Sequence, residues 1–244
     1  YTCGVAAWAC LSAHLKGVVE VGAFAGHSVG EYAALAAAGV LDVADGARLV
    51  QRRGELMAAS GRERPGGMAA VLGLDRAAIE KVFAKVPGTL AVANDNCPGQ
   101  LVISGDRDSV LAAVEPLQAA GAKRVLPLNV SGAFHSPLME ESARQMGEAL
   151  RETTFREGGR VFSNVTAQPV VQVSRWPDLL EAQLRSPVRW SETIENLANE
   201  GANTYVECGV GEVLLGLVKR IHREAKGLKV NDMTSLEETV FALR

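Results

Sequence analysis

The sequence has little of several features that define special classes of protein. Its 244 residues include four cysteines and four histidines, and no apolar run approaches the ~20 residues that span a bilayer. The formal net charge of −3 leaves no basic surplus for a nucleic acid. The cysteines lack C-x-x-C spacing and the histidines lie far apart, which argues against a disulfide scaffold and a metal site. We therefore expect reduced thiols, no metal, and neither a membrane nor a nucleic-acid partner.

The order of hydrophobic patterns predicts an α/β protein with an inserted subdomain. From Met68 to Val130 the pattern gives a strand, a helix, two strands around a Pro-Gly turn, a helix and a strand, which is the order of a ferredoxin-like unit. Before it, a helix with a capping arrangement at Asp42 runs to about Ser60 and is broken by the glycines and proline of SGRERPGG. We expect residues 65–130 to form the small subdomain and residues 1–64 and 131–244 the larger one. Tyr1 opens a helical pattern without an initiator methionine, so upstream residues are expected to be missing.

A serine lies between two glycines in AFAGHSVGEYAALAAAG, residues 23–39. Apolar residues 18–25 predict a strand, and helical spacing then continues to Gly39. Gly26 and Gly30 remove side chains that would collide in the turn, so Ser28 stands exposed at a helix N-terminus, as in α/β-hydrolase-like folds with a parallel sheet. Backbone N–H groups there stabilise an oxyanion. Serine is also a favoured N-cap, and the pattern alone leaves nucleophile and cap equally open.

A serine nucleophile needs an imidazole base within hydrogen-bond reach. His14 and His222 lie in helical segments that give no reason to place them at a site, and His27 next to the serine is interpreted as loop-shaping. His135 follows a predicted strand in a glycine-containing turn, where a side chain can face a cleft. A buried structural histidine is the alternative at this position. The stretch GVGEVL, residues 209–214, lacks the third glycine of a dinucleotide loop and is interpreted as a packing turn.

Four motifs in order carry a resemblance to a known family. GHSVGEYAAL and GAFHSPLM, with QRRGELM and NDNCPGQ between them, resemble the malonyl-CoA:acyl carrier protein transacylases and the related acyltransferase domains of fatty-acid and polyketide synthases. The resemblance runs to about Ile221. It implies transfer of malonyl from coenzyme A through a seryl ester to the phosphopantetheine thiol of acyl carrier protein. It also implies no tightly bound cofactor and a cytoplasmic monomer, with an organelle of bacterial descent as the other location.

The resemblance assigns the catalytic roles. Ser28 is the nucleophile, His135 is the general base, and the backbone N–H of Val29 is an oxyanion donor. No aspartate completes the set; instead the backbone carbonyl of Gln183, in AQLRSPVRW, orients His135. Family members begin with a strand and a G-Q-G loop that supplies a second oxyanion donor, and this sequence contains no such segment.

The resemblance also assigns the substrate-binding residues. Arg53 grips the free carboxylate of malonate with two parallel hydrogen bonds, the alternative being that it is a surface charge like Arg52. Phe134 limits substituents on the acyl α-carbon. His27, Asn94 and Asn96 lie near the substrate, with a turn-forming role as the alternative for the two asparagines.

Two other functions fit the sequence. A serine hydrolase is disfavoured by Arg53 and by the missing acidic residue, and a non-catalytic carrier-binding domain is suggested by the absent first segment. The carrier protein is acidic in this family, so four basic residues are predicted to contact it: Arg185, Arg189, Lys219 and Arg220.

Overall fold

The structure is a computed structural model that describes residues 1–15, 17–130 and 132–244. The chain divides into two compact units. Unit 1 consists of Tyr1–Val50, Thr154–Ser174 and Glu192–Arg244, and unit 2 consists of Gln51–Thr153 and Arg175–Ser191. Unit 2 therefore contains more of the chain than the insert predicted over 65–130, whose boundaries stay a prediction.

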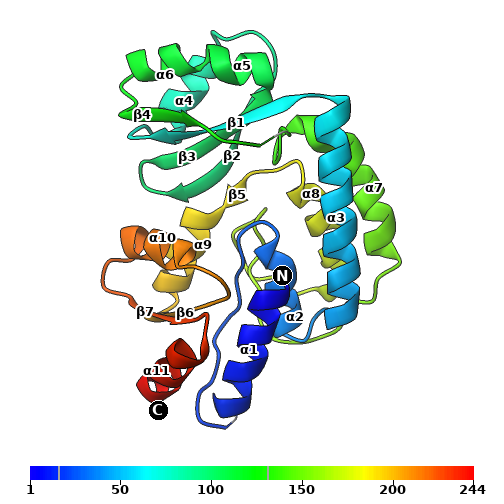
Figure 1. Cartoon of the computed structure of the whole chain (residues 1–244), viewed down its shortest axis with the longest axis vertical. Coiled ribbons are helices and arrows are strands. Elements are labelled where there is room, and N and C mark those ends of the chain that lie inside the picture. Colours follow the sequence, from blue (N-terminus) through cyan, green and yellow to red (C-terminus); the bar gives the residue numbers. More distant parts are fainter. Residues whose placement is uncertain (16, 131) are drawn as a thin grey trace. The chain divides into compact units, whose positions relative to one another are not determined.

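Unit 2 is built on a five-stranded sheet with the order β4-β1-β3-β2-β5 (Figure 1). The first four strands in that order pair antiparallel, and the short β5 lies parallel to β2. The strands are β1 (Gly66–Leu72), β2 (Leu90–Cys97), β3 (Gln100–Asp106), β4 (Arg124–Pro127) and β5 (Val188–Arg189). From β1 to β4, strands and helices follow one another in the predicted order.

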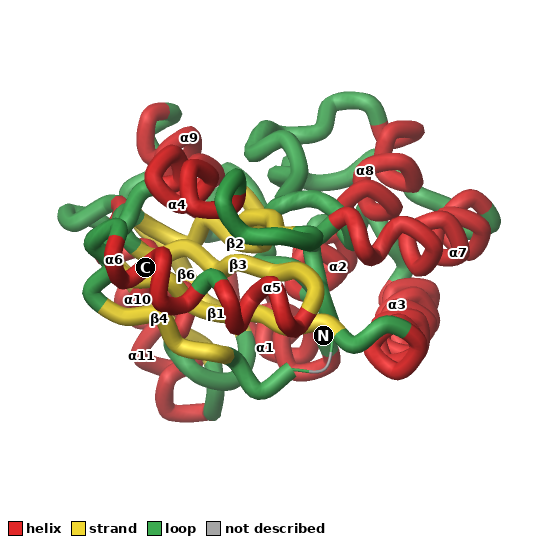
Figure 2. The backbone as a smooth tube through the Cα atoms, turned by 90° about the horizontal axis from the view of Figure 1, so that it is seen from above, coloured by secondary structure: helices red, strands yellow, loops and turns green. Residues whose placement is uncertain are grey.

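Three helices lie along one face of this sheet, as Figure 2 shows: α4 (Arg76–Phe83), α5 (Arg107–Ala112) and α6 (Val114–Ala119). Between them and the strands lies a core that includes Ile79, Ile103 and Leu117. The sequence predicts one helix where α5 and α6 are found, and that prediction is wrong at Ala113. Pro116 explains the break, because proline has no N–H and its ring collides with the carbonyl four residues earlier.

The rest of unit 2 is helical. Its elements are the second part of α3 (Val43–Glu63), the 3-10 turn η1 (Pro137–Met139), α7 (Glu140–Arg151) and α8 (Trp176–Gln183), preceded by the 3-10 turn η2 (Val173–Arg175). The predicted cap of α3 is confirmed, because Asp42 Oδ1 accepts the N–H of Ala44 at 2.8 Å. The same oxygen accepts the N–H of Asp45 at 3.3 Å, and the hydrogen bonds from Asp45 and Ala44 lower the pKa of Asp42 below its ordinary value. Helix α3 runs to Glu63, beyond the predicted end at Ser60, and stops before Pro65.

Unit 1 contains a parallel pair of strands, β6 (Thr204–Cys208) and β7 (Lys226–Val230), together with helices α1 (Thr2–Leu15), α2 (Gly30–Ala37), α9 (Trp190–Asn199), α10 (Val213–Ile221) and α11 (Met233–Leu243). Helix α9 begins in unit 2. Leu11 and Leu15 of α1 pack with Val230, Leu236 and Val240 of β7 and α11.

The strand expected before Ser28 is reduced to a single bridge. Phe24 pairs with Val161, its N–H donating to Arg160 at 2.8 Å while its carbonyl accepts from Phe162 at 3.0 Å. Within the described residues, no further ladder extends over positions 18–23. The apolar run alone could not reveal this, because a strand needs a partner segment at every step along its length.

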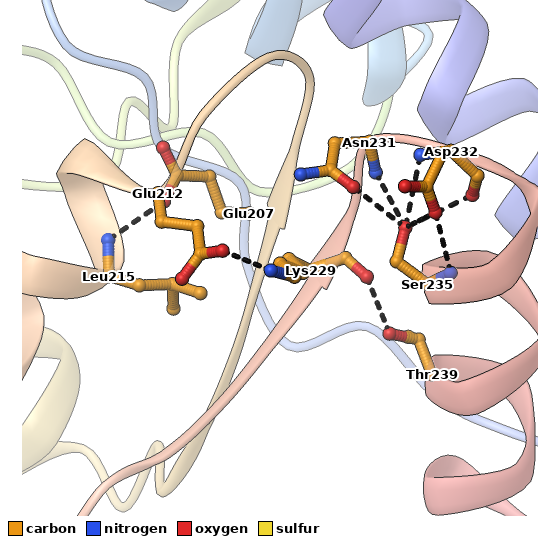
Figure 3. Close-up of polar contacts among 8 residues, drawn as sticks. All are labelled: Glu207, Glu212, Leu215, Lys229, Asn231, Asp232, Ser235 and Thr239. Atoms are coloured by element: carbon orange, nitrogen blue, oxygen red, sulfur yellow. Dashed lines mark hydrogen bonds and ion pairs between the residues drawn. The ribbon is translucent and has the colours of Figure 1, made fainter.

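Strand β7 and helix α11 were not foreseen. Helix α11 begins with a capping box in which the Asp232 carboxylate accepts the N–H of Ser235 at 2.7 Å and the Ser235 hydroxyl accepts the N–H of Asp232 at 3.0 Å (Figure 3). These contacts lower the pKa of Asp232, the backbone hydrogen bond most of all. None of the four cysteines, all in the described part of the chain, forms a disulfide. No helix over those residues is long and apolar enough to cross a membrane.

Candidate active site

Ser28 lies in unit 1, in a turn that puts its backbone in the left-handed region, with φ of 53°. The turn needs one of its two glycines. A Cβ on Gly26 would lie 2.0 Å from the carbonyl oxygen of Gly30, so no side chain fits there. A Cβ on Gly30 meets nothing within 4 Å, which corrects the expectation that both glycines prevent collisions.

The residues beside Ser28 take up the predicted turn-to-helix geometry. Helix α2 begins at Gly30 with Val29 as its N-cap residue, which puts the N–H of Val29 at a helix N-terminus, where such groups have no acceptor within the helix. The His27 carbonyl accepts the N–H of Gly30 at 2.9 Å, and His27 is half-buried. The N–H of Val29 therefore lies at a helix N-terminus, where a developing negative charge is stabilised.

A buried asparagine that sequence reasoning missed braces this turn. Asn164 Oδ1 accepts the backbone N–H of Ser28 at 2.7 Å, and Asn164 Nδ2 donates to the carbonyl of Gly26 at 2.7 Å. Its own backbone N–H donates to the Glu31 carboxylate at 3.1 Å, and both side chains are 1% exposed. No motif in FSNVTAQP marks Asn164, because its partners lie more than 130 residues away. Its third partner, the buried Glu31 of α2, is equally distant in the sequence.

His135 lies in unit 2 and is 4% exposed. Its Nδ1 lies 2.8 Å from the backbone oxygen of Gln183, and its backbone N–H donates to the carbonyl of Leu184 at 3.1 Å. The contact with Gln183 is the one that the family resemblance implies. A carbonyl oxygen can only accept, so Nδ1 carries the hydrogen and Nε2 has the lone pair.

The two carbonyls that hold His135 come from the end of α8, where the last carbonyls have no partner within the helix. That end of a helix carries partial negative charge, which stabilises a cation by about 0.3–1 kcal/mol and more when partly buried. This partial charge would stabilise an imidazolium formed on His135. His135 also has a left-handed backbone, with φ of 57°.

Arg53 is buried on α3, 4% exposed, while Arg52 beside it is exposed and lies 3.9 Å from the Glu55 carboxylate. Arg53 Nη2 donates to the side-chain oxygen of Gln183 at 3.1 Å. Arg53 therefore lies in the interior, and Arg52 is the surface charge. The structure brings Arg53, His135 and Gln183 together within unit 2.

Phe134 precedes His135 and packs against the sheet face opposite α4 to α6, beside Met68, Ala93 and Val102. A Cβ on Gly132 would lie 2.4 Å from the Phe134 ring, so this ring covers the glycine. Its position is thus fixed from two sides.

Asn94 and Asn96 are buried residues of β2, at 7% and 9% exposed, next to irregularities in the pairing of β2 with β3. The turn-forming role considered for them is wrong, because the turn itself lies at positions 98 and 99. Both are in unit 2 with Phe134 and His135.

The stretch GVGEVL leads into helix α10, and a carboxylate of the same chain already binds the N–H groups at the start of that helix. The Glu207 carboxylate accepts the N–H groups of Leu214 and Leu215 at 3.1 and 2.8 Å, and Lys229 pairs with Glu212 nearby (Figure 3). A nucleotide phosphate would need those same N–H groups. This contact agrees with the interpretation of the loop as a packing turn.

The other histidines and Arg185 contact residues of their own unit. Exposed His14 on α1 has its Nδ1 2.8 Å from the Cys10 carbonyl, and His222 Nδ1 lies 3.5 Å from the Tyr205 hydroxyl. Arg185 pairs with Glu140 at 3.2 Å. Over the residues that the structure describes, no cluster of three or more histidine, cysteine or acidic side chains is arranged to hold a metal ion.

The whole chain is similar to proteins of one known family. The family model described as "Acyl transferase domain" matches residues 3–237. The chain is 43% identical over 224 residues to the malonyl CoA-acyl carrier protein transacylase of Bacillus subtilis, covering 90% of this chain and 71% of that protein. It is 41% identical over 214 residues to that of Haemophilus influenzae, covering 86% and 69%.

Solved structures give the same result. A malonyl-transacylase in complex with a type II PKS acyl-carrier protein matches with a TM-score of 0.94 at 37% identity, covering 98% of this chain and 78% of that one. An acyl carrier protein S-malonyltransferase from Vibrio cholerae matches with a TM-score of 0.92 at 38% identity, covering 97% and 78%.

Proposed function

This chain belongs to the acyl transferase domain family and, within it, to the malonyl-CoA:acyl carrier protein transacylases, and we propose that Ser28, His135 and Arg53 carry its reaction. Its function is malonyl transfer to acyl carrier protein in fatty-acid or polyketide synthesis. Malonyl-CoA is the acyl donor in this family, and no step below needs a bound cofactor.

The first step makes a seryl ester. The Ser28 hydroxyl oxygen attacks the thioester carbonyl carbon of malonyl-CoA while Nε2 of His135 accepts the hydroxyl proton. The negative charge that develops on the carbonyl oxygen is stabilised by the N–H of Val29 at the start of α2. The carbon–sulfur bond then breaks, and the proton on His135 passes to the leaving thiolate of coenzyme A.

The second step reverses the first with a different thiol. The phosphopantetheine sulfur of the carrier protein attacks the seryl ester, and His135 takes the thiol proton and returns it to the Ser28 oxygen. Both steps need the same tautomer of His135, with the hydrogen on Nδ1. The hydrogen bond from Nδ1 to the backbone of Gln183, at 2.8 Å, is the observation that carries the proposal, because it leaves Nε2 as the proton acceptor.

Selectivity follows from the buried guanidinium. The buried Arg53 offers parallel N–H groups to the free carboxylate of malonyl, and an acetyl group has no carboxylate to accept them. Phe134, packed against the sheet, limits substituents on the acyl α-carbon. We also assign substrate contacts to three further residues: His27, Asn94 and Asn96.

We also propose the subdomain boundaries, the cellular location and the residues that contact the carrier protein. We assign residues 65–130 to a ferredoxin-like subdomain, on the antiparallel order β4-β1-β3-β2, and the remaining residues to a larger subdomain like the α/β-hydrolases. The protein acts as a cytoplasmic monomer. The similar structure that contains an acyl-carrier protein supports a carrier protein as the partner. We assign contacts with that carrier to four basic residues: Arg185, Arg189, Lys219 and Arg220.

The test is the mass of the protein after mixing with malonyl-CoA. A gain of one malonyl group, lost in Ser28→Ala and formed more slowly in His135→Ala, is the expected result, followed by transfer to holo acyl carrier protein. An unmodified mass in the intact protein would overturn the proposal. Release of free malonate faster than transfer to the carrier would instead identify a serine hydrolase.

A further inference from the structure

One residue of unit 2 contacts both the proposed base and the proposed carboxylate-binding cation. Gln183 ends α8 and is 0% exposed. Its backbone oxygen accepts from His135 Nδ1 at 2.8 Å, and its side-chain oxygen accepts from Arg53 Nη2 at 3.1 Å. The backbone of Gln183 contacts His135 and its side chain contacts Arg53, so a substitution can remove the second contact and keep the first.

The side-chain contact has a specific electrostatic property. A buried guanidinium is costly unless its N–H groups are hydrogen-bonded. A carboxylate acceptor would satisfy them but would also neutralise the charge of Arg53. The amide oxygen of Gln183 is a neutral acceptor, so this contact orients the guanidinium without placing a negative charge beside it.

We propose that the Gln183 side chain is a positioning residue that makes the enzyme selective for acyl groups carrying a free carboxylate, by fixing the guanidinium of Arg53. This rests on the proposed function of Arg53. The role of the Gln183 backbone toward His135 is separate, because every substitution at this position keeps the carbonyl.

Two substitutions separate the two roles. Gln183→Met keeps the length of the side chain and removes the acceptor, and Gln183→Glu keeps an acceptor and adds a negative charge. For Gln183→Met we expect kcat/KM with malonyl-CoA to fall about tenfold relative to kcat/KM with acetyl-CoA, mainly through KM, since one hydrogen bond to a charged group is lost. For Gln183→Glu we expect a larger loss, about a hundredfold, because the carboxylate competes with malonyl for Arg53. The acid side of the kcat–pH profile, which reports the base, stays in place in both.

Controls connect the effect to Arg53. Gln51→Met makes the same exchange on the exposed face of α3, where Gln51 contacts Glu55, and is expected to leave selectivity unchanged. In an Arg53→Ala background, Gln183→Met is expected to have no further effect on the malonyl-to-acetyl ratio. Thermal unfolding of each variant shows whether it is folded.

The outcomes distinguish this inference from the proposed function. Equal loss with both acyl donors, a shifted acid side of the pH profile, or a further selectivity loss in the Arg53→Ala background would overturn the inference. So would unchanged selectivity in a folded Gln183→Met or Gln183→Glu protein whose parent is malonylated at Ser28. Failure of the parent to become malonylated would overturn the proposed function itself.

Discussion

Replacing Asn164 with alanine should cost both stability and acylation rate. The side chain makes two hydrogen bonds of 2.7 Å, one from the N–H of Ser28 and one to the carbonyl of Gly26, at a position 1% exposed. Each lost hydrogen bond is worth about 1 kcal/mol, and each buried group left without a partner costs about 1–3 kcal/mol. Ser28 is half-buried, so water can partly replace the amide. We expect the free energy of unfolding to fall by about 2–4 kcal/mol.

The effect on rate follows from the backbone of Ser28. A left-handed conformation costs a residue with a Cβ roughly 1–2 kcal/mol, and the brace by Asn164 offsets that cost. Without the brace the turn relaxes toward negative φ and carries the hydroxyl with it. A displacement of about 1 Å lowers a rate about a hundredfold, so we expect malonylation of Ser28 to slow by that order.

The assays are urea unfolding and rapid-quench mass spectrometry of the malonyl-enzyme. Asn196→Ala is the matched control, because the side chain of this asparagine, in the same unit, donates to the Ala167 carbonyl at 2.9 Å. It should lose about 1 kcal/mol and keep its acylation rate. The reasoning is refuted if Asn164→Ala changes the rate less than twofold, or if Asn196→Ala slows acylation equally.

Three further predictions concern the turn, a helix cap and a thiol. Gly26→Ala should lower the free energy of unfolding by about 3 kcal/mol or more, or prevent folding, because the added Cβ would collide with a backbone oxygen. Gly30→Ala should change the free energy of unfolding little, and similar unfolding midpoints for the two variants would contradict this prediction. Glu207→Gln should lower the unfolding free energy by about 1 kcal/mol by removing charge from the N-terminus of α10, and an unchanged midpoint would count against the cap. Burial raises the pKa of Cys208 to about 11, so at pH 8 its thiol should react with a disulfide reagent far more slowly than that of exposed Cys10; equal rates would show that it is accessible. Because the thiol of Cys208 holds its proton more tightly in the folded protein than in the unfolded chain, the protonated thiol favours folding. This contribution to the free energy of unfolding is complete below pH 9 and is lost as the pH rises toward 11.

Features encoded by neighbouring residues could be predicted from the sequence. Asp42 caps α3 as expected, and the strands and helices from β1 to β4 follow the predicted order, because caps, turns and periodicity depend on a few adjacent side chains. Features that depend on distant partners could not. Of the strand expected before Ser28, only Phe24 has a partner, and the helix expected over positions 107–119 is interrupted at Ala113, three residues before Pro116.

The same division holds in the candidate site. Gln183 could be named from a motif, and its backbone does contact His135, although the chemical roles stay predictions. Its second contact, with Arg53, joins positions 130 residues apart and has no local signal. Asn164 was missed for the same reason. Sequence motifs thus indicate which residues react, while the residues that hold them in place require the fold.

The left-handed backbone at Ser28 can be tested by its effect on stability. Among the described residues, three other than glycine have positive φ: Ser28, His135 and Ala167, the last in the turn that carries Asn164. Strain of this kind gathers at functional sites because the surrounding structure enforces it. At Ser28 we therefore expect the glycine variant to be more stable than the alanine variant by about 0.5–1 kcal/mol, both being inactive. At Ser12, inside helix α1, the order should reverse by about 1 kcal/mol, since glycine is poor in helices. If the alanine variant is more stable than the glycine variant at both positions, the backbone at Ser28 is not strained. The hydrogen bonds of Asn164 would then have no strain to offset.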